Sequence, residues 1–375
     1  MHDVLVVGAG AAGGAAAFHL ARAGHDVSLL ERSECNEIKP CGGGMAASVQ
    51  SWFPFALDPA VEQVITQVNF SWCLEDNVVA KLPGKAPFWI VRRENLDQLL
   101  AEQAVASGAK LIRGFCVNKI IRNGDHWQVS AEDGRLSESR SLVIADGSAS
   151  PWAERLGLGP KHVNHASTTS VRLEGSGNLT SNSVHFEFGL VHHGFAWAFP
   201  IAGGVNVGVG TFIGRHAGDS DEILEQLLPG LGFDPDAGQR QQSSLRIWNG
   251  HRPLHGPGIV AIGDAASLCD PFLAEGLRPA LMSGCEAASS LDRWLKGETS
   301  DLSSYSSTMR YRWGDSMAWG RRIAQVFYRF PKVGYQLGIK RPTAPQRIAQ
   351  ILSGEMGYGD IAQRVIKRLL LQKTE

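Results

Sequence analysis

The 375-residue chain lacks several features that mark particular classes of protein. No run of apolar residues approaches the roughly 18 that a membrane-spanning helix requires. Met1-His2-Asp3 leads directly into a strand-like segment, so we expect no signal peptide. The six cysteines form no C-x-x-C pair and no zinc-like grouping with histidine. These absences predict a cytoplasmic protein with free thiols and no bound metal.

An overall excess of charge is also missing. The net charge of −1 and the isoelectric point near 6.9 argue against nucleic acid as the main partner. The charge is nevertheless uneven, because residues 310–375 contain 13 Lys/Arg against 4 Asp/Glu, with Trp313, Phe327 and Tyr328 among them. This basic C-terminal region predicts contact with an anionic membrane surface, an acidic electron-donor protein or a diphosphate. An ordinary solvated helical face is the alternative.

Glycine, by contrast, is abundant at 43 residues, and the first glycines stand in an ordered pattern. The apolar run 4–7 precedes a Gly-x-Gly-x-x-Gly loop, an alanine-rich helical stretch and a second strand that ends at Glu31. In such a unit Gly8 permits a tight turn, Gly10 lets the backbone approach a pyrophosphate, and Gly13 lets the helix pack closely. Glu31 is placed to accept hydrogen bonds from ribose hydroxyls. The pattern predicts dinucleotide binding.

Two later strand ends carry an acidic residue beside a glycine. The run 141–144 leads to Asp146-Gly147, and the run 259–262 leads to Gly263-Asp264. An acid at a strand end can bind polyol hydroxyls, although Asp264 taken alone fits a helix cap equally well. A helix that starts at Gly276 can direct its N–H groups at a flavin or a pyrophosphate. With the first motif, this set resembles the FAD-binding pattern of the flavoproteins that include aromatic-ring hydroxylases.

The middle of the chain alternates apolar and polar residues. Segments 170–173, 184–188, 195–199 and 205–209 predict antiparallel strands with one buried face each. Because alternate residues share a face, Phe195, Trp197 and Phe199 are expected to point together and, with Phe186 and Phe188, to form an apolar wall or to fill a core. His185, His192 and His193 lie nearby without carboxylate spacing, so we expect a proton relay or surface positions rather than a metal site.

Taken together, these patterns predict an α/β fold combined with antiparallel β structure. We expect a Rossmann-type FAD-binding domain interleaved with a β-sheet substrate domain and followed by a helical C-terminal region. The predicted boundaries are 1–67, 92–165 and 250–300 for the FAD-binding domain, 68–91 and 166–249 for the substrate domain, and 301–375 for the helical region.

Further motifs resemble one family. Lys39-Pro40-Cys41-Gly42-Gly43-Gly44-Met45 is similar to the Pro-Cys-Gly-Gly-Gly signature of geranylgeranyl reductases, and Arg93-Glu94-Asn95-Leu96-Asp97 matches the family's Arg-x-x-hydrophobic-Asp. The segment 194–200 resembles its Tyr-x-Trp-x-Phe-Pro motif, and the segments 352–355 and 358–360 resemble its C-terminal helical segment. The resemblance covers nearly the whole chain.

The chain departs from the family pattern at two positions. Phe195 stands where the family usually has Tyr, so any role of that hydroxyl is absent. Ala274 stands in place of the first glycine of Gly-Glu-Gly, which adds a methyl group beside the expected flavin edge. Both departures are compatible with FAD binding, but they leave the substrate less defined.

The resemblance implies a set of site residues. The candidate catalytic residues, chosen from the glycine loop and the alternating strand, are Cys41, Trp197 and Phe195, with the Cys41 thiol either a proton donor or a small side chain in a tight turn. The implied FAD-binding residues are Gly8, Gly10, Ala12, Gly13, Glu31, Arg32, Cys41, Gly42, Gly43, Gly44, Met45, Arg93, Val117, Asp146, Gly147, Asp264, Gly276 and Leu277.

The implied activity is FAD-dependent reduction of carbon–carbon double bonds in a geranylgeranyl or other polyprenyl chain, carried by a prenyl lipid or a prenyl diphosphate. No second Gly-x-Gly-x-x-Gly follows a strand, so the electron donor is expected to be NADPH acting directly at the flavin, or reduced ferredoxin. Two alternatives stay open at this point. One is an FAD-dependent monooxygenase or halogenase of the same fold, and the other is a flavin electron-transfer protein.

Overall fold

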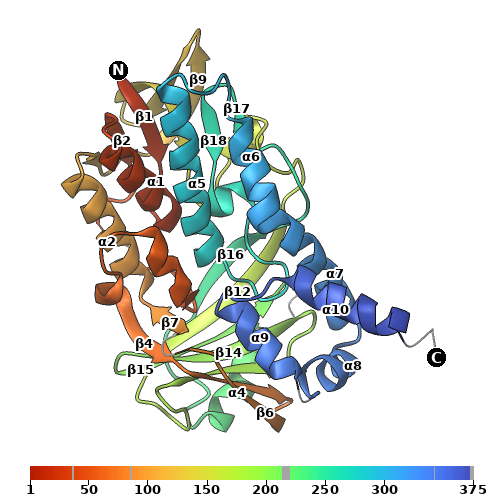
Figure 1. The fold of residues 1–375 in the computed structure, drawn as a ribbon. Helices are drawn as coiled ribbons and strands as arrows, with labels where there is room; N and C mark the ends of the chain where they lie inside the picture. The colour runs from red at the N-terminus through yellow and green to blue at the C-terminus, as the bar shows by residue number, and fades with distance from the viewer. Residues whose placement is uncertain (36–37, 85–86, 213–219, 342, 372–375) are drawn as a thin grey trace.

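The computed structural model describes residues 1–35, 38–84, 87–212, 220–341 and 343–371. In these residues the strands form three sheets, of eight, seven and three strands. Figure 1 shows the eight-stranded sheet at the end of the molecule that holds the N-terminus and the seven-stranded sheet at the opposite end. Helices of the second half of the chain run along the side and connect the two ends.

The eight-stranded sheet is parallel at its centre. Its strand order is β17-β18-β11-β1-β2-β8, and the hairpin of β9 and β10 is attached to β11. In β1, Val6 lies opposite Leu29 on one side and Val143 on the other, and the strand is buried from Val4 to Val7. Burial on both faces explains the unbroken apolar run. The strands are β1 (His2–Val7), β2 (Val27–Leu30), β8 (Lys110–Ile112), β9 (Val117–Asn123), β10 (His126–Ala131), β11 (Leu136–Ile144), β17 (His255–Gly256) and β18 (Ile259–Ala261).

Four helices accompany this sheet, and two of them pack unusually closely. They are α1 (Ala11–Arg22), α2 (Arg93–Ala106), α3 (Trp152–Arg155) and α5 (Leu277–Leu295). A Cβ atom at Gly284 of α5 would lie 2.5 Å from the carbonyl oxygen of Ala12 in α1, so this crossing accepts only glycine without a shift. The close crossing places the third turn of α5 beside the first turns of α1.

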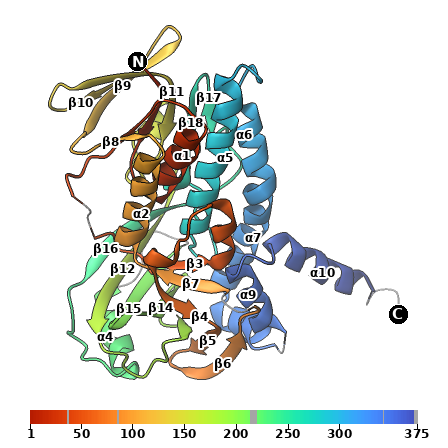
Figure 2. The same ribbon diagram turned by 60° about the vertical axis from the view of Figure 1, so that its left-hand side comes forward.

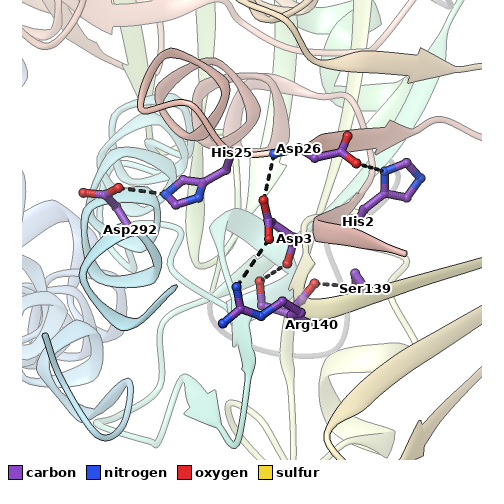
Figure 3. Close-up of polar contacts among 8 residues, drawn as sticks. His2, Asp3, His25, Asp26, Ser139, Arg140 and Asp292 are labelled. Carbon is purple, nitrogen blue, oxygen red and sulfur yellow. Dashed lines mark hydrogen bonds and ion pairs between the residues drawn. The ribbon is translucent and has the colours of Figure 1, made fainter. Parts of the chain in front are cut away.

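A polar cluster fixes the amino ends of the parallel strands (Figure 3). His2 Nδ1 lies 3.0 Å from Asp26 Oδ2, while the Asp3 carboxylate accepts the Asp26 N–H at 3.0 Å and an Arg140 N–H at 3.4 Å. His25 Nε2 lies 2.7 Å from Asp292 Oδ1, which joins the end of α1 to α5. This end of the sheet is therefore closed by side chains, and the carboxyl ends of the strands are left for a ligand.

The seven-stranded sheet has the order β16-β12-β15-β14-β13-β5-β6. In β14 the alternation is complete, because Phe195, Trp197 and Phe199 join the main core while Ala196 and Ala198 face α4 (Ser220–Gly230). Its strands are β5 (Gln67–Trp72), β6 (Glu75–Lys81), β12 (Asn164–Glu174), β13 (Ser183–Phe188), β14 (Gly194–Ile201), β15 (Gly204–Thr211) and β16 (Gln241–Ile247). The β5–β6 hairpin joins β13 in parallel, a pairing that the local pattern did not indicate.

A small third sheet lies between the two larger ones in both views (Figures 1 and 2). It consists of β3 (Gly44–Ala46), β7 (Phe88–Val91) and β4 (Val61–Ile65), paired in that order. Short helical turns at Ala47–Trp52 and Asp58–Ala60 connect β3 to β4. The Arg172 guanidinium on β12 donates to the Glu94 carboxylate on α2 at 2.7 and 3.2 Å. This ion pair connects the seven-stranded sheet to a helix that packs on the eight-stranded sheet.

The C-terminal region is helical. It comprises α6 (Ser303–Met309), a π-helical turn at Arg310–Gly314, α7 (Asp315–Arg329), α8 (Pro331–Gly334), a second π-helical turn at Tyr335–Ile339, α9 (Ala344–Leu352) and α10 (Tyr358–Leu371). Buried side chains anchor it, since Trp313 Nε1 donates to the Leu268 carbonyl at 2.8 Å and the Tyr328 hydroxyl donates to the Phe272 carbonyl at 2.7 Å. Helix α10 projects from the body (Figure 2). Residues 372–375 of the basic region lie outside the described residues.

The architecture confirms the predicted α/β class with an antiparallel sheet and C-terminal helices. The first sheet takes its strands from 2–30, 110–144 and 255–261, and the second from 67–81 and 164–247. The domain boundaries given above stay a prediction. Among the described helices, none combines the length and the hydropathy needed to cross a bilayer.

Candidate active site

A cavity of about 610 Å³ is lined by both large sheets. This volume lies within the roughly 300–1,000 Å³ that small-molecule sites occupy. One part of the lining comes from the carboxyl ends of β1, β2, β11 and β18, and another from aromatic side chains of β13 and β14. The loop 39–44 and the start of α5 complete it. The carboxyl edge of a parallel sheet is the expected place for a ligand in this kind of fold.

The glycine loop shapes the nucleotide end of this cavity. Gly8 has a φ of +104°, and a side chain there would collide with the carbonyl of Ala145. No side chain of the described residues caps α1, so its first N–H groups stay available to an anion. Glu31 Oε2 accepts the Ala9 N–H at 2.9 Å, and its Oε1 accepts the Ser33 N–H at 3.1 Å. The carboxylate is thereby fixed at the cavity wall.

Two basic side chains beside the glycine loop share one carboxylate as their hydrogen-bond partner. Asp97, on α2, accepts from Lys39 Nζ at 2.7 Å and from Arg93 Nη2 at 3.3 Å. A Cβ atom at Gly10 would lie 3.7 Å from Lys39 Nζ, so the ammonium group stands beside the loop. Burial opposes the charge of Arg93, but Asp97, Cys41 and Asp264 outweigh it and raise the pKa of the guanidinium. Both cations line the cavity and suit a negatively charged ligand.

A second set of charges surrounds Asp264. Burial raises the pKa of this carboxyl to about 6, against the lowering effect of Arg93 and Arg246. Arg246, on β16 of the seven-stranded sheet, donates to the carbonyl of Ser148 at 2.7 Å and to that of Ser150, in the segment that follows β11 of the eight-stranded sheet. Burial likewise raises the pKa of Asp146, whose Oδ1 is buried without a hydrogen-bond partner in the described residues.

The Cys41–Gly44 loop lies directly against the aromatic face of the second sheet. A Cβ atom at Gly42 would be 3.0 Å from Phe199 Cε2, and one at Gly44 would be 2.7 Å from Phe88 Cζ. The carbonyl of Cys41 accepts from Asn206 Nδ2 at 2.6 Å, and its Sγ accepts the Gly43 N–H at 3.3 Å. Glycine at position 42 therefore allows the loop to approach β14 closely, and Gly44 allows the same close approach to Phe88 of β7.

Aromatic rings form the apolar end of the cavity. Trp197 lies opposite Gly208 on the neighbouring strand, where even a methyl group would collide with its indole ring. The Trp197 Nε1 donor is buried without a partner in the described residues. Ring centroids are 5.3 Å apart for Phe186 and Phe199 and 4.8 Å apart for Phe195 and Phe212. These five aromatic residues line one continuous wall.

The segment before α5 adds an acid that sequence reasoning did not select. Ala274 adopts a φ of +55°, a conformation that favours glycine, and it precedes Glu275 at the cavity. Burial raises the pKa of the Glu275 carboxyl to about 7, although Arg278 Nη2 lies 2.7 Å from its Oε2. The nearby Asp270 accepts from the Tyr358 hydroxyl at 2.8 Å, which connects this segment to α10.

Most of the residues implied by the resemblance line the cavity. These are Gly8, Gly10, Ala12, Glu31, Arg32, Cys41, Gly42, Gly43, Gly44, Arg93, Val117, Asp146, Gly147, Phe195, Trp197, Asp264, Gly276 and Leu277. Gly13 and Met45 are not among the lining residues. Gly13 packs α1 against the Gly8 carbonyl, and Met45 is fully buried in β3 opposite Trp89.

Phe188 and the nearby His185 and His193 lie away from the cavity wall. Phe188 belongs to a separate ring cluster, with its ring 5.4 Å from that of Phe327 and not at the cavity wall. His185 lies 3.8 Å from Glu187 and 2.8 Å from Ser71 Oγ, whereas His193 contacts the Tyr328 carbonyl at 3.1 Å. No group of three or more His, Cys, Asp or Glu in the described residues is arranged to hold a metal ion.

The residues that sequence reasoning missed come from segments distant in the chain. Lys39 and Glu275 stood inside quoted motifs, and the sign of their charge was the available signal. Leu352 likewise stood inside a quoted segment. The other missed residues carried no local signal; they include Phe115, Trp152, Phe212, Leu245 and Leu273.

The cavity fits FAD. Two helices, α1 and α5, begin at its wall with Gly10 and Gly276 as N-caps and without side-chain caps in the described residues. Four of its lining residues hold a buried polar atom with no hydrogen-bond partner in that part of the chain, namely Arg93 Nε, Asp146 Oδ1, Trp197 Nε1 and the carboxylate oxygens of Glu275. Because such atoms are costly to leave unpaired, they indicate a polar ligand. Glu31 and the glycine loop suit the ribose and pyrophosphate.

Comparison with known proteins agrees with this fit. The family description "FAD dependent oxidoreductase" (DAO) matches residues 3–54. The digeranylgeranylglycerophospholipid reductase of Methanocaldococcus jannaschii is 28% identical over 314 residues, which cover 79% of this chain and 78% of that protein.

Two solved structures show the same fold. A geranylgeranyl bacteriochlorophyll reductase-like protein of Thermoplasma acidophilum superposes with a TM-score of 0.78 and 20% identity, over 87% of each chain. The flavin-dependent brominase Bmp2 superposes with a TM-score of 0.72 and 18% identity, over 99% of each chain. The matches confirm the predicted fold, the FAD-dependent oxidoreductase assignment and the resemblance to geranylgeranyl reductases.

The raised pKa of Asp264 predicts a pH-dependent affinity for FAD. A hydroxyl donor binds an ionised carboxylate more strongly than a neutral acid, so the affinity of the apoprotein should rise as pH increases through about 6. Asp264→Asn should bind FAD about tenfold more weakly above that pH and lose this rise. Quenching of flavin fluorescence across the range measures both effects.

Because Glu275 also titrates near this range, the difference between wild type and Asp264→Asn isolates the contribution of Asp264. Asp125→Asn, on an exposed hairpin, is the matched control and should behave as wild type. Parallel pH profiles for wild type and Asp264→Asn would contradict the assignment of Asp264 as a ligand of the cofactor.

Proposed function

We propose that this FAD-dependent oxidoreductase reduces carbon–carbon double bonds of a geranylgeranyl or other polyprenyl chain. The observation that carries the proposal is the shared cavity, in which the aromatic wall of β14 continues from the glycine loops that suit FAD. An apolar wall of this kind suits a hydrocarbon chain, and few polar groups interrupt it. The names of the M. jannaschii relative and of the T. acidophilum structure support a geranylgeranyl substrate.

The chemistry of an isolated alkene explains what the protein has to contribute. Such a bond offers no carbonyl to polarise, so rate enhancement rests on positioning the chain and on a proton source. When bound and reduced, FAD supplies a hydride. The hydride adds to one alkene carbon and a proton to the other, so the π bond breaks and two C–H bonds form. Phe195, Trp197 and Phe199 hold the chain and exclude water.

Two groups at the cavity can carry the proton. The first is Cys41 Sγ, which lies in the glycine loop against the aromatic face. The second is the Glu275 carboxyl, which lines the cavity and is nearly inaccessible to bulk solvent, with a residue exposure of 6%. A carboxyl with a pKa of about 7 stays partly protonated near neutral pH. Cys41→Ser and Glu275→Gln separate the two possibilities.

The electron donor is proposed to be NADPH or reduced ferredoxin. The sequence has no second glycine-rich phosphate loop after a strand, which supports direct reduction of the flavin without a separate nicotinamide domain. Rates of flavin reduction by each donor under anaerobic conditions distinguish them, and the ferredoxin reaction alone should slow steeply with salt.

An oxygen-consuming monooxygenase or halogenase is the second candidate. The full-length similarity to the fold of the brominase is its support. A third possibility is an electron-transfer flavoprotein, for which the basic C-terminal region provides a docking surface. Both differ from the reductase in a measurable way, because the first consumes oxygen with substrate and the second leaves the prenyl compound unchanged.

The proposed activity predicts a specific product. Protein whose flavin has been reduced with dithionite is expected to saturate geranylgeranyl substrates without oxygen, with two hydrogens gained per reduced bond and one flavin oxidised per bond. Mass spectrometry and flavin absorbance measure the two quantities together. Unchanged substrate across a panel of prenyl diphosphates, alcohols and lipids would contradict the proposal, as would oxygen uptake stoichiometric with substrate.

The aromatic wall predicts how turnover depends on Trp197. Trp197→Ala should lower kcat/KM for the prenyl substrate by about a hundredfold, because the chain loses its position against the flavin. Trp197→Phe should recover most of the loss. Flavin content should stay near wild type in both, which separates a substrate role from a cofactor role. Trp294→Ala, on α5 and away from the cavity, is the control.

A further inference from the structure

Large apolar side chains are exposed in a row near the end of α7 and in the segment that follows. Val326 is 67% exposed, Phe330 57%, Val333 55% and Leu337 54%. Val326 lies on α7, Phe330 directly follows that helix, Val333 lies on α8 and Leu337 lies in the turn after it. Phe327 is buried beneath this segment, with its ring against Gly334. Single exposed apolar residues are ordinary, but a row of four large ones marks an interaction surface.

Cations surround this row, and acids are missing from it. No Asp or Glu occurs between Asp315 and Glu355 in the sequence. Arg322, Arg329, Lys332 and Arg341 are exposed, and no carboxylate of the described residues lies within ion-pair distance of them. Lys340 differs, because it pairs with Asp76. We call the exposed set the basic apolar face; it comprises Arg322, Val326, Arg329, Phe330, Lys332, Val333, Leu337 and Arg341.

Buried contacts beneath this face hold α7, α8 and the following turn in place. A Cβ atom at Gly334 would lie 2.7 Å from Phe327 Cδ2, so α8 rests directly on a buried ring of α7. The Tyr335 hydroxyl donates to the Asp76 carbonyl at 2.6 Å and fixes the following turn to β6. The face is therefore a built surface rather than a loose tail.

The inner side of the same helix reaches the wall of the cavity. The ring of Tyr328 is 6.4 Å from that of Phe212, and Phe212 is 4.8 Å from Phe195. Both Phe212 and Phe195 line the cavity. Helix α7 thus presents Arg322, Val326 and Arg329 outward, and its Tyr328 packs against the aromatic wall inward.

We propose that the basic apolar face docks this protein on the surface of an anionic lipid bilayer. Its apolar side chains would enter the boundary between head groups and acyl chains, while its arginines and lysines contact lipid phosphates. This docking does not require the proposed reductase activity, although a lipid substrate would then be held close to the cavity.

The composition of the face favours a bilayer over an acidic protein. Four large aliphatic or aromatic side chains project between the cations, and long basic side chains beside apolar ones are typical of membrane interfaces. Arg329 also lies over the ring of Phe330, at 5.9 Å from its centroid, which keeps charge and apolar surface together.

The test is co-sedimentation of the FAD-loaded full chain with phosphatidylcholine vesicles that contain or lack phosphatidylglycerol. Wild type should bind the anionic vesicles and be released by salt. Arg322→Gln/Arg329→Gln/Lys332→Gln should bind about a hundredfold more weakly, given the usual contribution of a cation near an anionic surface. Val326→Ser/Phe330→Ser/Leu337→Ser should also lose binding, which an attraction of charges alone does not explain.

The controls carry the same chemical changes elsewhere on the surface. Lys110→Gln/Lys119→Gln/Lys161→Gln changes the net charge equally, and Val105→Ser/Leu136→Ser removes exposed apolar residues far from the face. Both should bind like wild type, with flavin content and thermal unfolding confirming the fold of every variant. Absent binding of wild type, or equal losses in the controls, overturns the proposal, as does salt-sensitive binding to reduced ferredoxin with none to vesicles. Vesicle binding without prenyl turnover would reject the reductase activity alone.

Discussion

The approach of the Cys41–Gly44 loop to β14 is the contact on which the site depends. Gly42 lies so close to Phe199 of β14 that a side chain there would press against the ring, and Gly44 packs equally closely on Phe88 of β7. The amide of Asn206 holds the loop from the second sheet through the Cys41 carbonyl. Because the glycine loop at Gly8 and the aromatic wall share one cavity, this contact makes one site out of two sheets.

Several buried polar and charged groups around the same cavity destabilise the fold, and a bound ligand can offset this loss of free energy. Arg93, Asp146 and Trp197 each leave a buried polar atom without a partner in the described residues, and each such atom costs about 1–3 kcal/mol. Asp264 and Glu275 are held at raised pKa values by burial, with Arg93, Arg246 and Arg278 opposing the shift. A bound FAD that supplies partners for these groups would recover part of that free energy, so the binding of the cofactor and the stability of the fold should be linked.

Sequence reasoning reached the parts of the site that have local causes. The strand at 4–7, the glycine loop and Glu31 follow from rules that act within thirty residues, and the alternation around Trp197 gave its face correctly. It could not reach Arg246 or Phe212, whose roles depend on pairings between distant strands, nor the parallel pairing of β5 with β13. Whether Phe188 belongs to the wall or to the core stayed open, because alternation gives the face of a strand but not which part of that face a cavity covers.

The central claim is that a prenyl chain lies against the flavin in this cavity, and flavin absorbance tests it most directly. Oxidised, FAD-loaded protein would be titrated without oxygen with geranylgeranyl diphosphate and, in parallel, with inorganic diphosphate. The account predicts a saturable shift of the flavin bands with the prenyl compound and none with diphosphate alone. Binding of the prenyl compound, measured by equilibrium dialysis, that leaves the flavin spectrum unchanged would contradict it.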